Sequence, residues 1–99
     1  MESPIFDFNN EKNAKLLAER GIGFEDVIAV LGTKGYLAVI DHPNPQKYPN
    51  QQIYIIEVEG YVYLIPFEKQ GHKVILKTIY PSRKMTRLYQ EKLTRGKQK

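Results

Sequence analysis

A short stretch near the end of the sequence, KTIYPSRK at residues 77–84, places cations where a helix is expected to begin. Arg83 and Lys84 would interact unfavourably with the helix dipole, at a cost of about 0.3–1 kcal/mol each. Arg83 and Arg87 would also form a like-charge pair one turn apart. Local choices that work against stability are expected at functional sites. A bound anion would turn these unfavourable charge interactions into favourable ones, because free helix N–H groups and guanidinium groups both bind phosphate. The alternative is that these cations point into water or pair with carboxylates.

Lys77 and Tyr80 could belong to the same site. Alternation along the expected strand puts Lys77 on one face with Ile75 and Ile79, and Tyr80 on the other. Lys77 would either extend along an exposed sheet face, which is the commoner outcome, or project into a cleft beside Arg83. Tyrosines beside cations can stack on bases of single-stranded RNA, but they are also ordinary strand residues.

Few other residues have the types and spacing of a catalytic or metal site. The chain has two histidines, His42 and His72, and neither stands at a metal-ligand spacing from other histidines or carboxylates. Each is more simply a surface residue than a general base. Ser82 lacks the G-x-S-x-G context of a hydrolase nucleophile and is better explained as a helix cap. There is also no phosphate-binding glycine loop. Because both this loop and a metal-ligand spacing are missing, the sequence predicts neither a metal nor a cofactor.

The composition indicates a single cytoplasmic domain. The chain has 99 residues and no cysteine, which excludes a disulfide scaffold and fits a reducing compartment. It has no apolar run near the ~20 residues of a membrane span, and its first residues do not resemble a signal peptide. We therefore expect a protein that does not act in a membrane.

The net charge of +4 hides an asymmetry along the chain. Residues 1–68 carry five Lys or Arg and ten Asp or Glu, a net charge of −5, whereas residues 69–99 carry ten Lys or Arg and one acid, a net charge of +9. So basic a segment predicts a polyanionic partner, either nucleic acid or an acidic protein segment. The alternative is a solubilising surface followed by a frayed basic tail.

The elements that must position these residues form an α+β domain over residues 1–93. They are an edge strand at 5–8, helices at 11–21 and 24–32, strands at 35–41, 52–59, 61–68 and 72–80, and a helix from Ser82 to about Leu93. Hairpin turns at Glu59-Gly60 and before His72 predict an antiparallel sheet of four main strands, with a short fifth at the N-terminus. Residues 94–99 are expected to form a basic disordered tail.

Two segments have a further expected role. The last helix has an apolar stripe that should face the core, opposite its arginines, formed by Met85, Leu88, Tyr89 and Leu93. The proline-rich segment DHPNPQKYPNQ at residues 41–51 excludes regular structure. A connection of this length is either packed against the body of the protein or functional.

The order and spacing of two motifs resemble the BrnT-like toxins. The first is FDFNNEKNAKLLAERGIGFEDV, an aromatic-Asp-aromatic start followed by a Lys-bearing helix and a Phe-Glu-Asp segment. The second is ILKTIYPSRKMTRLY, a strand that runs into a Ser-Arg-Lys segment and a basic helix. The hairpin EGYVYLIPF and the HPN and KYPNQ before it resemble a subgroup of short toxin-like proteins. Together the resemblance covers residues 5–90.

This resemblance implies a RelE-like fold, ribosome-independent RNA cleavage and a small cognate antitoxin, often one with a ribbon-helix-helix DNA-binding part. The residues that match family positions are the helix lysine Lys12, the first Glu of the Phe-Glu segment Glu25, the strand cation Lys77 and the arginine after serine Arg83. Glu19-Arg20-Gly21 stands where the family has Lys-His-Gly, so a histidine often found there is missing.

The sequence supports two hypotheses. In the first, the chain is the ribonuclease toxin of a type II toxin–antitoxin module and forms a hetero-oligomer with its antitoxin. The RNA 2′-hydroxyl attacks the adjacent phosphate, which Arg83 and Arg87 bind; Lys77 or Tyr80 carries a proton or stabilises charge, and Glu25 is the alternative base. In the second, the chain is an inactive homologue whose basic C-terminal face holds an antitoxin or nucleic acid without chemistry.

Overall fold

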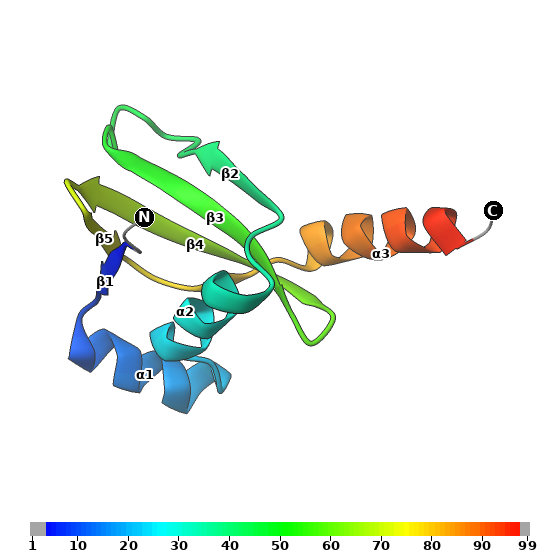
Figure 1. Ribbon diagram of the computed structural model, residues 1–99, viewed down its shortest axis with the longest axis horizontal. Helices are drawn as coiled ribbons and strands as arrows, with labels where there is room; N and C mark the ends of the chain where they lie inside the picture. The colour runs from blue at the N-terminus through cyan, green and yellow to red at the C-terminus, as the bar shows by residue number, and fades with distance from the viewer. Residues whose placement is uncertain (1–3, 98–99) are drawn as a thin grey trace.

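The computed structural model describes residues 4–97, and the side chains of residues 4–92 (Figure 1). Two helices near the N-terminus, a mostly antiparallel sheet and a helix at the C-terminus confirm the predicted α+β class. The elements are β1 (Ile5–Asp7), α1 (Asn10–Arg20), α2 (Phe24–Thr33), β2 (Ala38–Asp41), β3 (Gln51–Val58), β4 (Tyr61–Gln70), β5 (Lys73–Leu76), β6 (Tyr80–Pro81) and α3 (Arg83–Lys97).

The sheet has six strands where four main strands were expected. Its order is β1-β5-β4-β3-β2. The short strand β6 also pairs with β4, nearer the start of β4 than the residues that pair with β5. All pairings are antiparallel except that of β1 with β5. The short strand β1 therefore lies at an edge, as the sequence predicted, and it makes the one parallel pair among the described strands.

The β3–β4 hairpin is the centre of the sheet. It pairs Gln51 with Glu68 at one end and Val58 with Tyr61 at the other. The turn residues Glu59 and Gly60 have φ values of 51° and 83°, and positive φ at both central positions is the requirement of a type I′ turn. The hairpin predicted from the sequence is confirmed.

The last predicted strand is broken into β5 and β6 by an extra residue. Leu76 pairs with Phe67 and Tyr80 pairs with Leu64, so the chain advances four residues while β4 advances three. Such an insertion is a bulge, and it lies where Pro66 has no N–H to give to the ladder. Because the alternation shifts by one residue, Ile79 is fully buried in the core, so the prediction that it shares a face with Lys77 is wrong.

Local capping explains why α1 and α2 form where they do. The Asn9 side chain accepts the Lys12 N–H at 2.9 Å, and Gly21 ends α1 with a φ of 72° and an N–H bond to the Leu17 carbonyl. The Asp26 carboxylate accepts the Gly23 N–H at 2.8 Å and so caps α2. Both helices pack on the same face of the sheet (Figure 1).

The core lies between these two helices and the sheet. Its helical part comes from α1 and α2, and its sheet part comes from one face of β3, β4 and β5 and from the segment before β6. The buried members are Leu16, Ile22, Phe24, Val27, Tyr54, Ile56, Ile65, Phe67, Val74, Leu76 and Ile79. The other face of the sheet, here called the second face, carries Ile53, Leu64 and Glu68, because side chains alternate along each strand.

The C-terminal helix α3 leaves the sheet and extends away from the body of the protein (Figure 1). Its first turn contacts β4 through Thr86, which is 7% exposed, whereas Leu88 is 49% exposed. The prediction that an apolar stripe of α3 faces the core is therefore wrong for Leu88. Met85 and Tyr89 are half-buried. The side chain of Leu93 lies outside the described residues.

The end of α3 also differs from the sequence prediction. The helix continues to Lys97, so residues 94–97, expected in a disordered tail, are helical. Residues 98 and 99 lie outside the described part of the chain. No helix in the described residues is both long and apolar enough to cross a membrane.

Candidate functional site

The predicted site residues near the C-terminus follow one edge of β4. The Lys77 N–H donates to the Pro66 carbonyl at 2.8 Å, and the Ser82 N–H donates to the Val62 carbonyl at 2.9 Å. Between these two points β4 spans four residues, roughly 13 Å of strand. Arg83 and Arg87 then follow on the first turns of α3. The name cationic row is used here for three cations and the tyrosine between them: Lys77, Tyr80, Arg83 and Arg87.

Lys77 and Tyr80 both lie on the second face of the sheet, so the prediction that they point to opposite faces is wrong. Tyr80 pairs with Leu64, and Lys77 Nζ lies 3.7 Å from Glu68 Oε1. Leu64 and Glu68 are four residues apart on β4 and so point to the same face. Tyr80 is 50% exposed and Lys77 is also exposed. A surface ion pair of this kind contributes little free energy, so Glu68 does not prevent Lys77 from binding an anion.

The start of α3 has the cap that the sequence predicted. The Ser82 hydroxyl accepts the Met85 N–H at 3.1 Å, and the Ser82 carbonyl accepts the Thr86 N–H at 3.0 Å. The backbone N–H groups of Arg83 and Lys84 belong to the first turn of the helix, where N–H groups have no carbonyl partner within the helix. They are free to bind water or an anion.

The arginines of α3 have no acidic partner among the described side chains. Arg83 and Arg87 are exposed, and neither takes part in an ion pair there. The nearby carboxylate of Glu57 instead binds Lys34 and the Gly60 N–H. The arginines are therefore available to an anion from outside the chain.

Glu25 is not brought together with the cationic row. It lies exposed in the first turn of α2, and α2 covers the opposite face of the sheet from Lys77 and Tyr80. A carboxylate separated by the sheet cannot take a proton from a group bound at the second face. Neither His42 nor His72 makes a hydrogen bond or ring contact with the cationic row in the described part of the chain.

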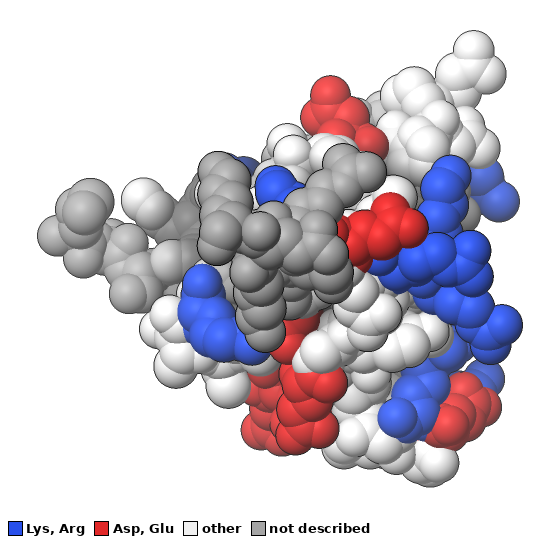
Figure 2. Space-filling view, turned by 90° about the vertical axis from the view of Figure 1, so that its right-hand side faces the viewer, with Lys and Arg blue, Asp and Glu red and all other residues white. Residues whose placement is uncertain are grey.

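The positive charge is divided over the end of the molecule from which α3 projects. Figure 2 shows Lys and Arg side chains gathered along one edge of this view, with acidic side chains beside them and nearer the middle of the view. The cations therefore do not form one uninterrupted patch on this side. No group of three or more His, Asp or Glu side chains in the described residues could hold a metal ion.

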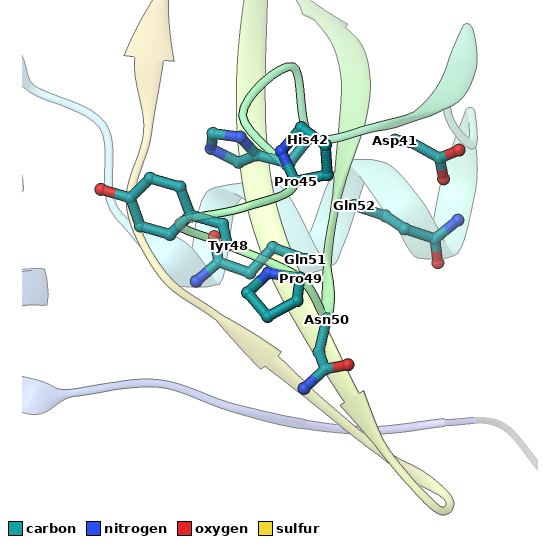
Figure 3. Close-up of a pocket in the computed structure, with 8 residues that line it drawn as sticks. All are labelled: Asp41, His42, Pro45, Tyr48, Pro49, Asn50, Gln51 and Gln52. Carbon is teal, nitrogen blue, oxygen red and sulfur yellow. The ribbon is translucent and has the colours of Figure 1, made fainter.

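A pocket lies elsewhere, in the proline-rich segment between β2 and β3 (Figure 3). Its volume is about 470 Å³, and none of the predicted site residues lines it. The lining residues are Asp41, His42, Pro45, Tyr48, Pro49, Asn50, Gln51 and Gln52. The sequence indicated this segment through its length, its prolines and the HPN and KYPNQ motifs, but it did not identify which side chains form the pocket.

The proline-rich segment is held by its own hydrogen bonds. The Tyr48 N–H donates to the Asn44 carbonyl at 3.0 Å, the Gln51 N–H to the Tyr48 carbonyl at 3.3 Å, and the His42 N–H to the Gln51 carbonyl at 3.2 Å. The His42 ring lies against the Tyr48 ring with a centroid distance of 4.3 Å. The segment is thus an ordered loop that places aromatic and amide groups together.

Comparisons with the models of known protein families, with curated proteins and with solved structures gave no match to this chain.

Proposed function

We propose that this protein is the toxin of a type II toxin–antitoxin module, a RelE-like endoribonuclease that acts in the cytoplasm without a metal ion. The support comes from three sources: the motifs that resemble BrnT-like toxins, the α+β order of the elements, and the basic C-terminal segment. The observation that carries the proposal is the exposed cationic row, which joins a sheet edge to a helix N-terminus.

In the proposed reaction the RNA supplies its own nucleophile. The 2′-hydroxyl oxygen attacks the adjacent phosphorus, the bond to the 5′-oxygen breaks, and the products are a 2′,3′-cyclic phosphate and a 5′-hydroxyl. Arg83 and Arg87 would bind the scissile phosphate and stabilise the charge that develops on it. Lys77 or Tyr80 would stabilise charge or transfer a proton. Glu25 has no part in this scheme because α2 places it beyond the other face of the sheet.

The proposed partner is a small cognate antitoxin, of the kind that often carries a ribbon-helix-helix part. An acidic antitoxin segment would bind the same cations that bind RNA, and binding would therefore inhibit cleavage. The extended α3, with Leu88 exposed, adds apolar area for such a contact. The complex would be a hetero-oligomer.

A second candidate is a non-catalytic binding module. Two observations favour it. Lys77 forms an ion pair with Glu68, and neither His42 nor His72 makes a hydrogen bond or ring contact with a described residue of the cationic row. In that case the cations would hold an antitoxin or nucleic acid without cleaving it.

Regulated expression in a host cell separates the two candidates. We expect the natural protein to arrest growth and degrade RNA, and Arg83→Ala to abolish both while it still folds and binds the antitoxin. Lys92→Ala is the matched control because it removes one exposed positive charge from the same helix. Growth arrest that persists in Arg83→Ala would contradict the nuclease proposal, and a natural protein with no effect on RNA would favour the binding module.

A further inference from the structure

The pocket in the loop between β2 and β3 has the chemical groups that recognise a nucleobase. Two rings, His42 and Tyr48, lie against each other at 34° between their planes. Figure 3 shows these rings and the Gln51 side chain on one side of the start of β3, with Asp41 and Gln52 on the other. Flat aromatic surfaces beside amide groups are the means by which proteins bind unstacked bases of RNA.

The polar groups of the pocket can read the edge of a base. The His42 Nδ1 accepts the Asn44 N–H at 3.0 Å, so a neutral His42 carries its hydrogen on Nε2 and can donate it. The Gln51 side chain, which lies on the same side of β3 as the rings, offers both a donor and an acceptor. Lys47 Nζ lies 5.4 Å from the centre of the Tyr48 ring, where it could pair with the phosphate of the same nucleotide.

The pocket is close to the cationic row. Gln51 pairs with Glu68, and the Glu68 carboxylate lies 3.7 Å from Lys77 Nζ. Glu68 is opposite Ile75 of β5, so Gln51 and Lys77 are separated by two strand spacings and by two residues along the strands, roughly 12 Å, on the second face of the sheet. A single RNA strand that binds Lys77 could place a neighbouring base in the pocket.

We propose that this pocket binds one nucleobase of single-stranded RNA and so sets the sequence preference of the protein. The inference rests on the proposed function for its RNA partner. The loop is well suited to this role because its prolines and backbone hydrogen bonds fix the rings before the base arrives, which lowers the entropic cost of binding.

The two histidines of the chain provide a direct test by NMR. His42 lines the pocket, whereas His72, at the turn between β4 and β5, does not, so the His72 ring signals are an internal reference. The probes are the four ribonucleoside 5′-monophosphates, with ribose 5-phosphate as the control that lacks a base. We expect at least one monophosphate to shift the His42 signals, while ribose 5-phosphate leaves them unchanged and the His72 signals stay in place.

A hexaribonucleotide of the preferred base should produce the same shift at a lower concentration than the monophosphate, since the cationic row adds phosphate contacts. The proposal fails if no monophosphate shifts His42, or if ribose 5-phosphate shifts it equally. A monophosphate that binds as tightly as the hexaribonucleotide would contradict RNA as the partner.

Variants of the pocket give a second measurement. Tyr48→Leu should weaken the binding of the base by about tenfold or more, and Tyr48→Phe should keep it, because stacking depends on the ring. If Tyr48→Leu fails to fold, Gln51→Ala should alter the preference among bases. Gln46→Ala is then the matched control, because Gln46 lies in the same loop without lining the pocket. Unchanged preference in Gln51→Ala would overturn the role of the amide.

The failure of this proposal can be told apart from the failure of the nuclease proposal. Arg83→Ala should lose cleavage and keep the response of His42 to the monophosphate. Cleaved RNA with no His42 response would leave the nuclease standing and remove the base pocket. A His42 response without cleavage would leave the pocket standing and remove the nuclease.

Discussion

At the scale of single residues, Thr86 joins the start of α3 to the sheet. It is 7% exposed, and its hydroxyl donates to the Ser82 carbonyl at 2.7 Å and accepts the Val62 N–H at 2.8 Å. These bonds hold the first turn of α3 at the edge of β4. Thr86 thereby fixes where Arg83 and Arg87 lie relative to Lys77.

Replacing Thr86 tests this role. Thr86→Val keeps the shape of the side chain but leaves the Val62 N–H buried without a partner, so we expect the free energy of unfolding to fall by about 1–3 kcal/mol. Urea denaturation measures the change. Thr33→Val is the control, since the Thr33 hydroxyl bonds only within its own exposed helix end. Equal stability of Thr86→Val and the natural protein would contradict the account.

Glu57 illustrates how a side chain ties two elements together. The hydrogen bond from Lys34 lowers the pKa of Glu57 below its ordinary value of 4.5, and the bond from the Gly60 N–H lowers it further, against the opposing effect of burial. The carboxylate thus links the end of α2 to the β3–β4 turn. A group whose pKa is lower in the folded state stabilises the protein above its unfolded pKa.

This linkage predicts a pH dependence. The contribution of Glu57 should be complete near neutral pH and should disappear as the pH falls through its lowered folded-state pKa. Glu57→Gln should therefore destabilise the protein near neutral pH and have a smaller effect in acid, below that pKa. Denaturation at both pH values checks this; a destabilisation that is equal in both would show that the charge of Glu57 is irrelevant.

Sequence reasoning at this scale succeeded where a residue acts on its own neighbours. Ser82 was identified as a cap because its partner, the Met85 N–H, lies three residues away. Thr86 and Asn13 could not be identified in this way. Thr86 binds Val62, and the Asn13 side chain accepts the Phe24 N–H at 2.7 Å, so each partner is brought close only by the fold.

At the scale of elements, α1 and α2 meet closely at Gly23. A Cβ atom on Gly23 would lie 2.6 Å from Asn13 Oδ1 and 2.9 Å from Leu17 Cγ. Asn13 cannot simply move aside, because this oxygen accepts the N–H of Phe24. The close approach therefore needs a glycine.

Two glycine substitutions should have opposite effects on stability. Gly23→Ala should lower the free energy of unfolding by about 1–3 kcal/mol, since it forces the two helices apart. Gly32→Ala, in the last turn of α2, meets nothing within 4 Å and should raise stability by up to about 1 kcal/mol, because alanine favours the helix. Thermal unfolding compares the two; a stabilised Gly23→Ala would contradict the packing described here.

The predictions for the elements differed in success for physical reasons. The helices predicted at 11–21 and 24–32 correspond to α1 and α2, and the turn residues Glu59 and Gly60 predicted the β3–β4 hairpin. The break between β5 and β6 was missed because it depends on Pro66, which lies across the ladder in β4 rather than in the broken strand. The apolar stripe of α3 was predicted to be buried, but periodicity does not show whether a partner is present within the chain.

At the scale of the whole molecule, the predicted site residues are divided between the two faces of the sheet, and the pocket lies apart from them. The cationic row joins the second face of the sheet to α3, Glu25 lies on the helix-covered side, and the pocket forms in the loop before β3. The basic character of the C-terminal segment could be predicted from its composition. Its distribution over two elements was not, because it depends on the direction in which α3 leaves the sheet.

The central claim is that this protein cleaves RNA through Arg83 without a metal ion. The most direct test incubates the purified natural protein with single-stranded RNA in the presence of a metal chelator and analyses the ends of the products by mass spectrometry. We predict 2′,3′-cyclic phosphate and 5′-hydroxyl ends, about 100-fold or more fewer cuts with Arg83→Ala, and unchanged cleavage with Lys92→Ala. RNA left intact by the natural protein, with or without ribosomes, would contradict the claim.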